Sequence, residues 1–172
     1  MGAKEVIMDA ADIDRTLTRM VHKILEVHKG VNGLTLIGIQ TRGVYLARRM
    51  RAKIRDIEGA EVLTGDMDIT LYRDDWTRIS QHPVVQATDI LFSVDGRQII
   101  LVDDVLFTGR TIRAAMDAIM DFGRPDRIEL AVLVDRGYRE LPIQADYVGR
   151  FVETRHSETV NVFLKEHDGE DR

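Results

Sequence analysis

The segment from residue 98 to residue 122 constrains the fold more than any other part of the chain. It opens with Gln98-Ile-Ile-Leu-Val102, which has the length and apolar composition of a buried strand. Two adjacent carboxylates, Asp103 and Asp104, follow, and residues 111–122 then space their apolar side chains as one helix face. A buried strand that runs into a helix in this way is typical of a parallel sheet with helical crossovers.

The rest of the chain alternates helix and strand signals in the same way. Asp9 is a predicted N-cap for an amphipathic helix that ends before Gly30, and a second helix is predicted from Val44 to about Ile57. Strands are predicted at 34–39, 62–72, 128–134, 147–151 and 160–164, an irregular flap at 73–96 and a polar tail at 165–172. With three prolines and no repeat or linker, the pattern predicts one α/β domain over residues 1–172, with a mainly parallel central sheet flanked by helices.

The composition favours an ordinary globular protein of the cytoplasm. Hydrophobic residues make up 44% of the chain and charged residues 31%. The longest apolar runs are about five residues, too short to span a bilayer, and the N-terminus shows no apolar stretch of the secretory type. The count of zero cysteines excludes disulfide bonds and thiolate catalysis.

The charge is distributed unevenly along the chain. The net charge of −5 disfavours a protein that binds nucleic acid nonspecifically. However, residues 1–60 carry 11 Lys and Arg against 7 Asp and Glu, whereas residues 61–172 carry 13 against 22. Arginine predominates among the basic residues, and its planar guanidinium can grip a phosphate through two oxygens. A local basic face on an acidic protein therefore stays possible.

The turn that follows Asp103 and Asp104 has the residues of a phosphate site. Thr108, Gly109 and Thr111 stand at the start of a predicted helix, where backbone N–H groups and hydroxyls can bind a monophosphate. The two carboxylates would repel that phosphate, but they suit the vicinal hydroxyls of a sugar or a divalent cation about one sugar's width away. Together these features predict a site for a ribose 5-phosphate. The alternative, that the acids merely cap the helix, would require only one of them.

This segment resembles the phosphoribosyl diphosphate signature of the type I phosphoribosyltransferases. Other segments are similar to one family within them, the PyrR family of bacterial pyrimidine operon attenuators that are also uracil phosphoribosyltransferases. These segments are 40–48, 68–75, 123–125, 133–143 and 145–149. The resemblance covers about residues 9–164 and implies the type I phosphoribosyltransferase fold, with a flexible flap over the active site.

The resemblance implies a reaction and a set of site residues. Ribose 5-phosphate would pass from 5-phosphoribosyl 1-diphosphate to uracil, giving UMP and pyrophosphate, with Mg²⁺ bound alongside the donor. The implied catalytic residues are Asp103, Asp104 and Arg42, of which the two acids would also face the Mg²⁺. The implied ribose 5-phosphate loop is Asp103, Asp104, Val105, Leu106, Phe107, Thr108, Gly109, Arg110 and Thr111. The implied pyrophosphate site is Thr41, Arg42, Gly43 and Arg73, and the implied uracil or nucleotide contacts are Asp135, Arg136, Gly137 and Val160.

Members of the PyrR family also bind pyrimidine operon mRNA when loaded with UMP. The first predicted helix carries Arg15, Thr18, Arg19 and His22 at i, i+3, i+4 and i+7, a stripe that can meet RNA phosphates. Arg139, Arg150 and Arg155 would join it if the fold brings them close. A solvated helix face is the competing interpretation of that stripe.

The resemblance implies further partners and leaves alternatives. Relatives form dimers or higher homo-oligomers, and no membrane partner is expected. The alternatives are a salvage enzyme that has lost RNA regulation, a nucleotide-sensing RNA regulator with little catalysis, and another type I enzyme such as a purine salvage transferase.

Overall fold

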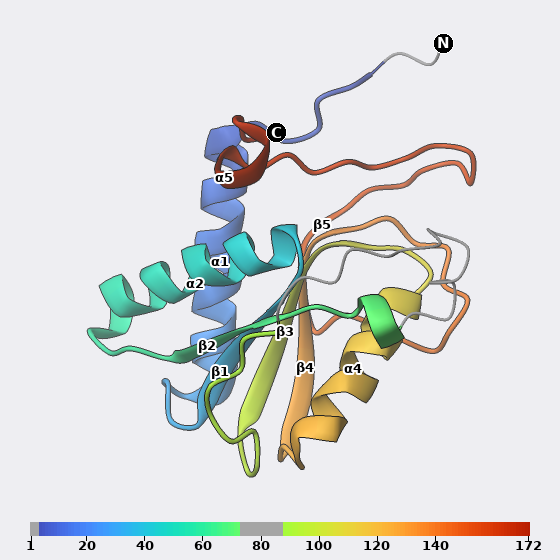
Figure 1. Ribbon diagram of the computed structural model, residues 1–172. Helices are drawn as coiled ribbons and strands as arrows, with labels where there is room; N and C mark the ends of the chain where they lie inside the picture. Colours follow the sequence, from blue (N-terminus) through green and yellow to red (C-terminus); the bar gives the residue numbers. More distant parts are fainter. Residues whose placement is uncertain (1–3, 73–87) are drawn as a thin grey trace.

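The computed structural model describes residues 4–72 and 88–172, and a five-stranded parallel sheet forms its centre (Figure 1). The strand order is β2-β1-β3-β4-β5, and every neighbouring pair is parallel. The strands are β1 (Leu34–Ile39), β2 (Leu63–Met67), β3 (Gln98–Leu106), β4 (Arg127–Asp135) and β5 (Tyr147–Phe151). Because all strands run the same way, their carboxyl ends meet at one edge of the sheet.

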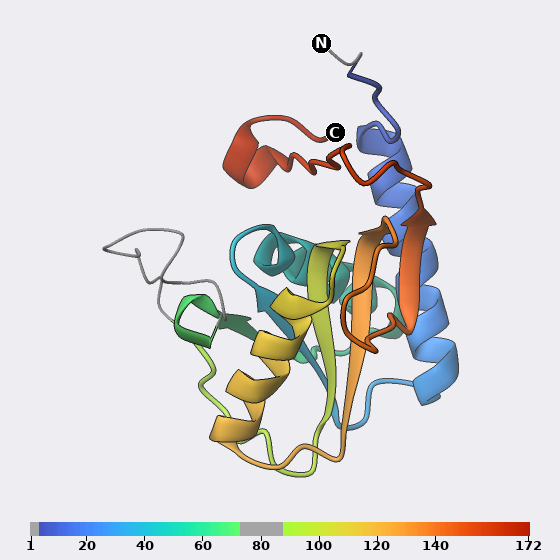
Figure 2. The same ribbon diagram turned by 90° about the vertical axis from the view of Figure 1, so that its right-hand side faces the viewer.

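Helices cover both faces of this sheet (Figure 2). On one face, α1 (Ala10–His28) and α2 (Arg42–Glu58) pack in one apolar cluster with side chains of β1, β3 and β4. On the other, α4 (Arg110–Phe122) packs in a second cluster. The central strands are apolar almost throughout because both of their faces are buried. The predicted architecture is confirmed.

The predicted start of α1 is also confirmed in atomic detail. The side chain of Asp9 accepts a hydrogen bond from the backbone N–H of Asp12 at 2.8 Å, and the Asp12 carboxylate accepts one from Asp9 N–H at 3.2 Å. This capping box satisfies donors that the first helical turn leaves open. The helix ends at Lys29, which adopts the left-handed conformation.

Two of the predicted strands differ from the observed structure. The strand predicted at 62–72 stops at Met67, because the Asp68 carboxylate accepts hydrogen bonds from the N–H and hydroxyl of Thr70 and starts a 3-10 turn (Thr70–Tyr72). The strand predicted at 160–164 does not form. That stretch packs Val162 and Leu164 into the core instead, and a short helix, α5 (Lys165–Asp168), follows.

Most of the segment predicted as a flap, 73–87, lies outside the described residues. The remaining part, 88–96, packs against the sheet. The backbone of Asp89 pairs with that of Asp66, and the side chain of Val94 is fully buried in the α4-side cluster. This part of the chain therefore extends the core.

Candidate active site

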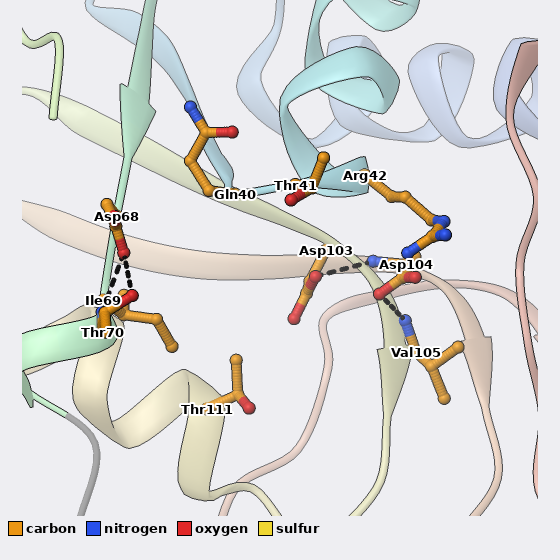
Figure 3. A pocket seen from close by; sticks show the side chains of 10 residues that line it. All are labelled: Gln40, Thr41, Arg42, Asp68, Ile69, Thr70, Asp103, Asp104, Val105 and Thr111. Carbon is orange, nitrogen blue, oxygen red and sulfur yellow. Dashed lines mark hydrogen bonds between the residues drawn. The ribbon is translucent and has the colours of Figure 1, made fainter. Parts of the chain in front are cut away.

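A cavity of about 300 Å³ opens at the carboxyl edge of the sheet, between the ends of β1, β2 and β3 (Figure 3). Its lining combines carboxylates, hydroxyls and one arginine. The lining residues are Gln40, Thr41, Arg42, Asp68, Ile69, Thr70, Asp103, Asp104, Val105 and Thr111. The fold thus brings residues of the predicted ribose 5-phosphate loop and of the predicted pyrophosphate site to one polar cavity.

The two central acids lie within β3 rather than after it. β3 extends to Leu106, which pairs with Asp135 of β4, so the backbone of Asp103 and Asp104 is fixed by the sheet. Asp103 Oδ1 accepts a hydrogen bond from Asp104 N–H at 2.9 Å, and Asp104 Oδ1 accepts one from Val105 N–H at 2.8 Å. Each carboxylate is therefore held rigidly at the cavity wall.

The two acids differ in their surroundings. Asp103 is only 7% exposed, whereas Asp104 is partly open to the cavity. Burial, and then the neighbouring charge of Asp104, raises the pKa of Asp103 well above the usual range of an aspartate. Asp104 is therefore the acid that is more open to a ligand in the cavity, and Asp103 lies buried behind it.

The N-terminus of α4 forms the anion end of the site. Gly109, with φ of 92°, precedes the helix and has no side chain to cap it, so the N–H groups of the first turn beyond Arg110 have no intrahelical acceptor and suit an anion. The Thr108 hydroxyl accepts a hydrogen bond from Arg110 N–H at 3.3 Å. The side chain of Arg110 donates from Nε to Glu140 at 2.7 Å.

The middle of the predicted ribose 5-phosphate loop has a packing role. Leu106 is buried in the α4-side cluster, and Phe107 lies under the guanidinium of Arg136, 4.0 Å from its ring centroid. The carbonyl oxygen of Thr108 accepts hydrogen bonds from the N–H groups of Glu140 and Leu141. These contacts tie the loop to the segment that follows β4.

The loop between β1 and α2 forms the opposite wall. The peptide bond between Gln40 and Thr41 is cis, and Arg42 is the first residue of α2. Gly43 packs directly against the β3 backbone, since a Cβ atom there would lie 2.3 Å from the Val102 carbonyl oxygen. The Arg42 guanidinium donates two hydrogen bonds to Asp168. Arg73, the fourth predicted pyrophosphate residue, lies outside the described residues.

The four predicted nucleotide residues are not part of the cavity lining. The carboxylate of Asp135, at the end of β4, accepts from Gly137 N–H at 3.0 Å and from Arg139 Nη2 at 2.5 Å. Arg136 is 6% exposed, and its Nε has no hydrogen-bond partner among the described residues. Val160 packs against the α1/α2-side cluster.

The predicted basic stripe lies on the outer face of α1. His22 is exposed, and Arg15 pairs with Asp12 at 2.6 Å. Thr18 accepts a hydrogen bond from Lys53 at 2.9 Å. Arg15 of the stripe thus contacts a neighbour within α1, and Thr18 contacts α2.

Long-range contacts join the stripe to β5. Arg19 donates to the Gly149 carbonyl, which places it beside Arg150, and Arg150 itself donates to the Ile7 carbonyl. Arg155 lies in the exposed loop after β5. Arg139 does not join this face, because its guanidinium donates to Phe107, Gly137 and Ile143 carbonyls and to Asp135.

Four residues of the lining have no role predicted from the sequence, namely Gln40, Asp68, Ile69 and Thr70. Asp68, which is 9% exposed, is the first residue after β2, as Gln40 is the first residue after β1. Its position at a strand's carboxyl end was the available signal, since all such ends meet at one edge. The prediction of a longer strand, to residue 72, concealed it.

The described residues contain no group of three or more His, Cys, Asp or Glu side chains placed to hold a metal ion. They also contain no helix long and apolar enough to cross a membrane.

Comparison with known proteins identifies similar chains. Residues 7–166 match the family described as phosphoribosyl transferase domain. The chain is 57% identical over 168 residues to a protein of Elusimicrobium minutum called bifunctional protein PyrR, covering 98% of this chain and 94% of that one. A protein of Geobacter sulfurreducens with the same name is 60% identical over 164 residues, covering 95% and 93%.

Solved structures support the same fold at much lower identity. A hypoxanthine phosphoribosyltransferase of Trypanosoma cruzi has a TM-score of 0.70 at 17% identity, covering 88% of this chain and 80% of that one. A hypoxanthine-guanine phosphoribosyltransferase of Bacillus anthracis has a TM-score of 0.68 at 16% identity, covering 88% and 86%.

Proposed function

The chain belongs to the phosphoribosyltransferase family, and within it to the PyrR proteins, and we propose that it makes UMP from uracil and regulates a pyrimidine operon. The enzymatic reaction transfers ribose 5-phosphate from 5-phosphoribosyl 1-diphosphate to N1 of uracil. The observation that carries this proposal is the cavity itself, which has the Asp103–Asp104 pair on one wall and Thr111, in the first turn of α4, on another. A ribose 5-phosphate in this cavity would place its hydroxyls against the two acids and its phosphate at the start of α4.

The transfer breaks the bond between C1 of the ribose and the pyrophosphate oxygen and forms a bond between C1 and N1 of uracil. The N1 proton is released to solvent. Positive charge develops on the ribose ring as the leaving group departs, and the carboxylates of Asp103 and Asp104 stabilise it. Thr108, Gly109 and Thr111 bind the 5-phosphate at the start of α4, which anchors the sugar while C1 moves between the two groups.

The pyrophosphate leaves toward the opposite wall. Arg42 and the backbone around Thr41 and Gly43 bind it there, since Arg42 is the cation in the described lining. Arg73 is assigned to the same leaving group by the resemblance alone. We propose that the uracil is surrounded by Asp135, Arg136, Gly137 and Val160. The first three lie at or directly after the end of β4, which pairs with β3 at the same edge of the sheet.

The acidic wall fits a magnesium ion that enters with the donor. Mg²⁺ prefers oxygen ligands and is usually held by one or two carboxylates together with substrate phosphates. Asp103 and Asp104 supply two adjacent carboxylates at the cavity. When bound, the ion neutralises charge on the leaving pyrophosphate.

The regulatory activity is assigned to the outer face of α1 together with β5. Arg15, Thr18, Arg19 and His22 lie there, and the Arg19 contact with the Gly149 carbonyl brings this stripe next to Arg150. We assign Arg155, in the loop after β5, to the edge of the same surface. Leader mRNA of the pyrimidine operon is the proposed partner, bound through the phosphates of a folded hairpin. We also propose that the protein forms homo-oligomers and resides in the cytoplasm.

The enzymatic half is tested by measuring UMP formation from uracil, the phosphoribosyl donor and Mg²⁺. Asp104→Asn should lose most of this activity while keeping the fold, since an amide has nearly the same shape. Turnover of hypoxanthine, guanine or orotate without turnover of uracil would contradict the substrate while preserving the reaction class.

The regulatory half is tested by gel shift with the 5′ leader of the organism's own pyrimidine operon, with and without UMP. Binding that is strengthened by UMP supports the bifunctional protein. UMP synthesis without leader binding identifies a salvage enzyme, and UMP-dependent binding without turnover identifies a sensor.

A further inference from the structure

The last eleven residues of the chain fold back onto α2, on the side of the sheet where the cavity opens (Figures 1 and 2). Val162 and Leu164 anchor this segment in the core, with exposures of 5% and 0%. The backbones of Phe163 and Arg172 pair through two hydrogen bonds, at 2.8 and 3.0 Å, and close the segment into a hook around α5. We call residues 162–172 the C-terminal hook. Its position is fixed by packing and by its own backbone.

The C-terminal hook contacts the cavity through one ion pair. Arg42 donates from Nε to Asp168 Oδ2 at 3.0 Å and from Nη2 to Oδ1 at 2.7 Å, an arrangement with two parallel hydrogen bonds. The Asp168 side chain is 13% exposed, and that of Arg42 is 30% exposed. Asp168 Oδ2 also accepts the backbone N–H of Leu164 at 2.8 Å. This backbone hydrogen bond fixes the Asp168 carboxylate within the C-terminal hook independently of its ion pair with Arg42.

A second set of ion pairs holds the C-terminal hook independently of Asp168. Arg49, two turns further along α2, donates to Glu166 at 2.6 and 2.8 Å and to Asp171 at 2.7 and 3.1 Å. Asp171 in turn accepts the Lys165 N–H at 2.7 Å. Because these contacts do not involve Arg42, the hook offers a rigid support for it.

Arg42 is also part of the cavity wall, close enough to Asp104 for the charge of that carboxylate to favour its protonated form (Figure 3). A guanidinium has five N–H groups, of which two are given to Asp168. The others remain for an anion in the cavity. The Arg42 guanidinium is thus held by the C-terminal hook through one edge, and its other N–H groups can bind a substrate in the cavity.

We propose that Asp168 is a positioning residue, which holds the Arg42 guanidinium at the cavity wall in the orientation that binds the pyrophosphate of the donor. The inference rests on the proposed function, in that it takes Arg42 as the pyrophosphate ligand. A free arginine loses side-chain freedom when it binds an anion, and an arginine already fixed by Asp168 loses less. Asp168 itself contacts no substrate. Its effect is therefore expected on pyrophosphate and not on uracil or UMP.

The direct test measures binding of inorganic pyrophosphate, with Mg²⁺, to the full chain by calorimetry. Asp168→Asn removes the charge that orients Arg42 and should weaken pyrophosphate binding about tenfold. Asp168→Glu, which restores a carboxylate, should recover part of that loss. Glu166→Gln is the matched control, because it weakens the hook's contact with Arg49 and leaves Arg42 paired; its pyrophosphate affinity should stay within about twofold of wild type.

Two further measurements separate positioning from a merely structural role. The UMP affinity of Asp168→Asn should match that of wild type, since UMP carries no pyrophosphate, and the melting temperatures of Asp168→Asn and Glu166→Gln should be similar. In steady-state assays Asp168→Asn should raise KM for the phosphoribosyl donor about tenfold with KM for uracil unchanged.

Three results would overturn the proposal. Tighter pyrophosphate binding by Asp168→Asn would mean that Asp168 competes with the substrate for Arg42. Unchanged binding would mean that Arg42 needs no support, and equal weakening of UMP and pyrophosphate would indicate general damage to the site. If the wild-type chain binds pyrophosphate but makes no UMP, the proposed function fails, while the comparison of pyrophosphate affinities still decides the role of Asp168.

Discussion

Gly43 and Val102 touch so closely that no side chain fits between them. A Cβ atom at position 43 would lie 2.3 Å from the Val102 carbonyl oxygen and 3.2 Å from the Cα of Asp103. The first turn of α2 therefore rests directly on the strand that carries the central acids. This contact sets the distance between the pyrophosphate wall, which holds Arg42, and the acidic wall of the cavity.

Gly43→Ala should separate these two walls. We expect it to destabilise the fold by about 1–3 kcal/mol, the usual cost of overpacking, and to raise KM for the phosphoribosyl donor. Urea denaturation and steady-state kinetics measure the two effects. As a control, Ala52→Gly in the middle of α2 should cost about 1 kcal/mol of helix stability and leave KM unchanged. A Gly43→Ala enzyme with the wild-type KM would show that the contact does not position the site.

We expect the charged form of Asp103 to lower the stability of the fold, although the side chain is needed for activity. Its raised pKa means that the folded protein holds this proton more tightly than the unfolded chain. Stability from this group is therefore greatest at acidic pH and is lost as the pH rises from the ordinary value of 3.8 through the raised one. Asp103→Asn removes the charge and keeps an oxygen that can accept the Asp104 N–H.

The expected result for Asp103→Asn is a higher urea midpoint than wild type at pH 8, with the difference vanishing toward pH 4. UMP synthesis should fall about a hundredfold or more. Asp117→Asn, on α4, provides the comparison, because that side chain is 43% exposed and should give no such pH-dependent gain. A difference that is constant across this pH range would argue against the raised pKa.

The buried contact between His28 and Glu129 ties the end of α1 to the sheet. His28 Nε2 lies 2.5 Å from Glu129 Oε2, the side chains are 2% and 8% exposed, and the Tyr147 hydroxyl donates to the same oxygen at 3.1 Å. Burial, and then the charge of Glu129, raises the pKa of Tyr147, which keeps this hydroxyl a donor. His28→Ala should cost about 1–3 kcal/mol, because the buried Glu129 carboxylate loses one of its hydrogen-bond partners and keeps Tyr147 and Arg127.

Thermal and urea denaturation measure this loss. His22→Ala, on the exposed face of the same helix, should change stability by less than about 0.5 kcal/mol. If His28→Ala and His22→Ala unfold at the same urea concentration, the His28–Glu129 contact contributes nothing to the stability of the fold. KM values should be unaffected, because Glu129 lies near the start of β4 and the cavity lies beyond the strand ends.

Sequence patterns were sufficient for the five strands of the sheet, for α1, α2 and α4, and for much of the cavity wall, but not for residues 160–164, which form no strand. Apolar runs placed the parallel strands, and the rule that strand ends meet at one edge brought Arg42 and Asp104 together. The same patterns did not identify Asp168 as a partner of Arg42, because the two residues are 126 positions apart and ion pairing leaves no periodic signal. An acidic C-terminus has the composition of a solvated tail until the packing of Val162 and Leu164 fixes its path.

For Arg139 the sequence suggested a role that the contacts of its side chain do not support. Its charge suggested a place on an RNA-binding face, but its donors are used by backbone carbonyls and Asp135. An intramolecular crosslink and a phosphate contact require the same residue type, so only the surroundings distinguish them. The α1 stripe differs, because its side chains lie on the surface of a regular helix, where the spacing alone determines the face.

Arg19 and His22 should contribute to RNA affinity and not to catalysis. The double variant Arg19→Ala with His22→Ala should weaken UMP-dependent binding of the leader hairpin about tenfold and lower the slope of log affinity against log salt by about 1–2. Gel shifts at several salt concentrations measure both quantities, and the rate of UMP synthesis should stay at the wild-type level. Arg124→Ala is the control, since this exposed arginine follows α4 on the other face of the sheet. Equal losses in the control and the double variant would indicate a general effect of charge, and an undiminished affinity in the double variant would remove α1 from the RNA surface.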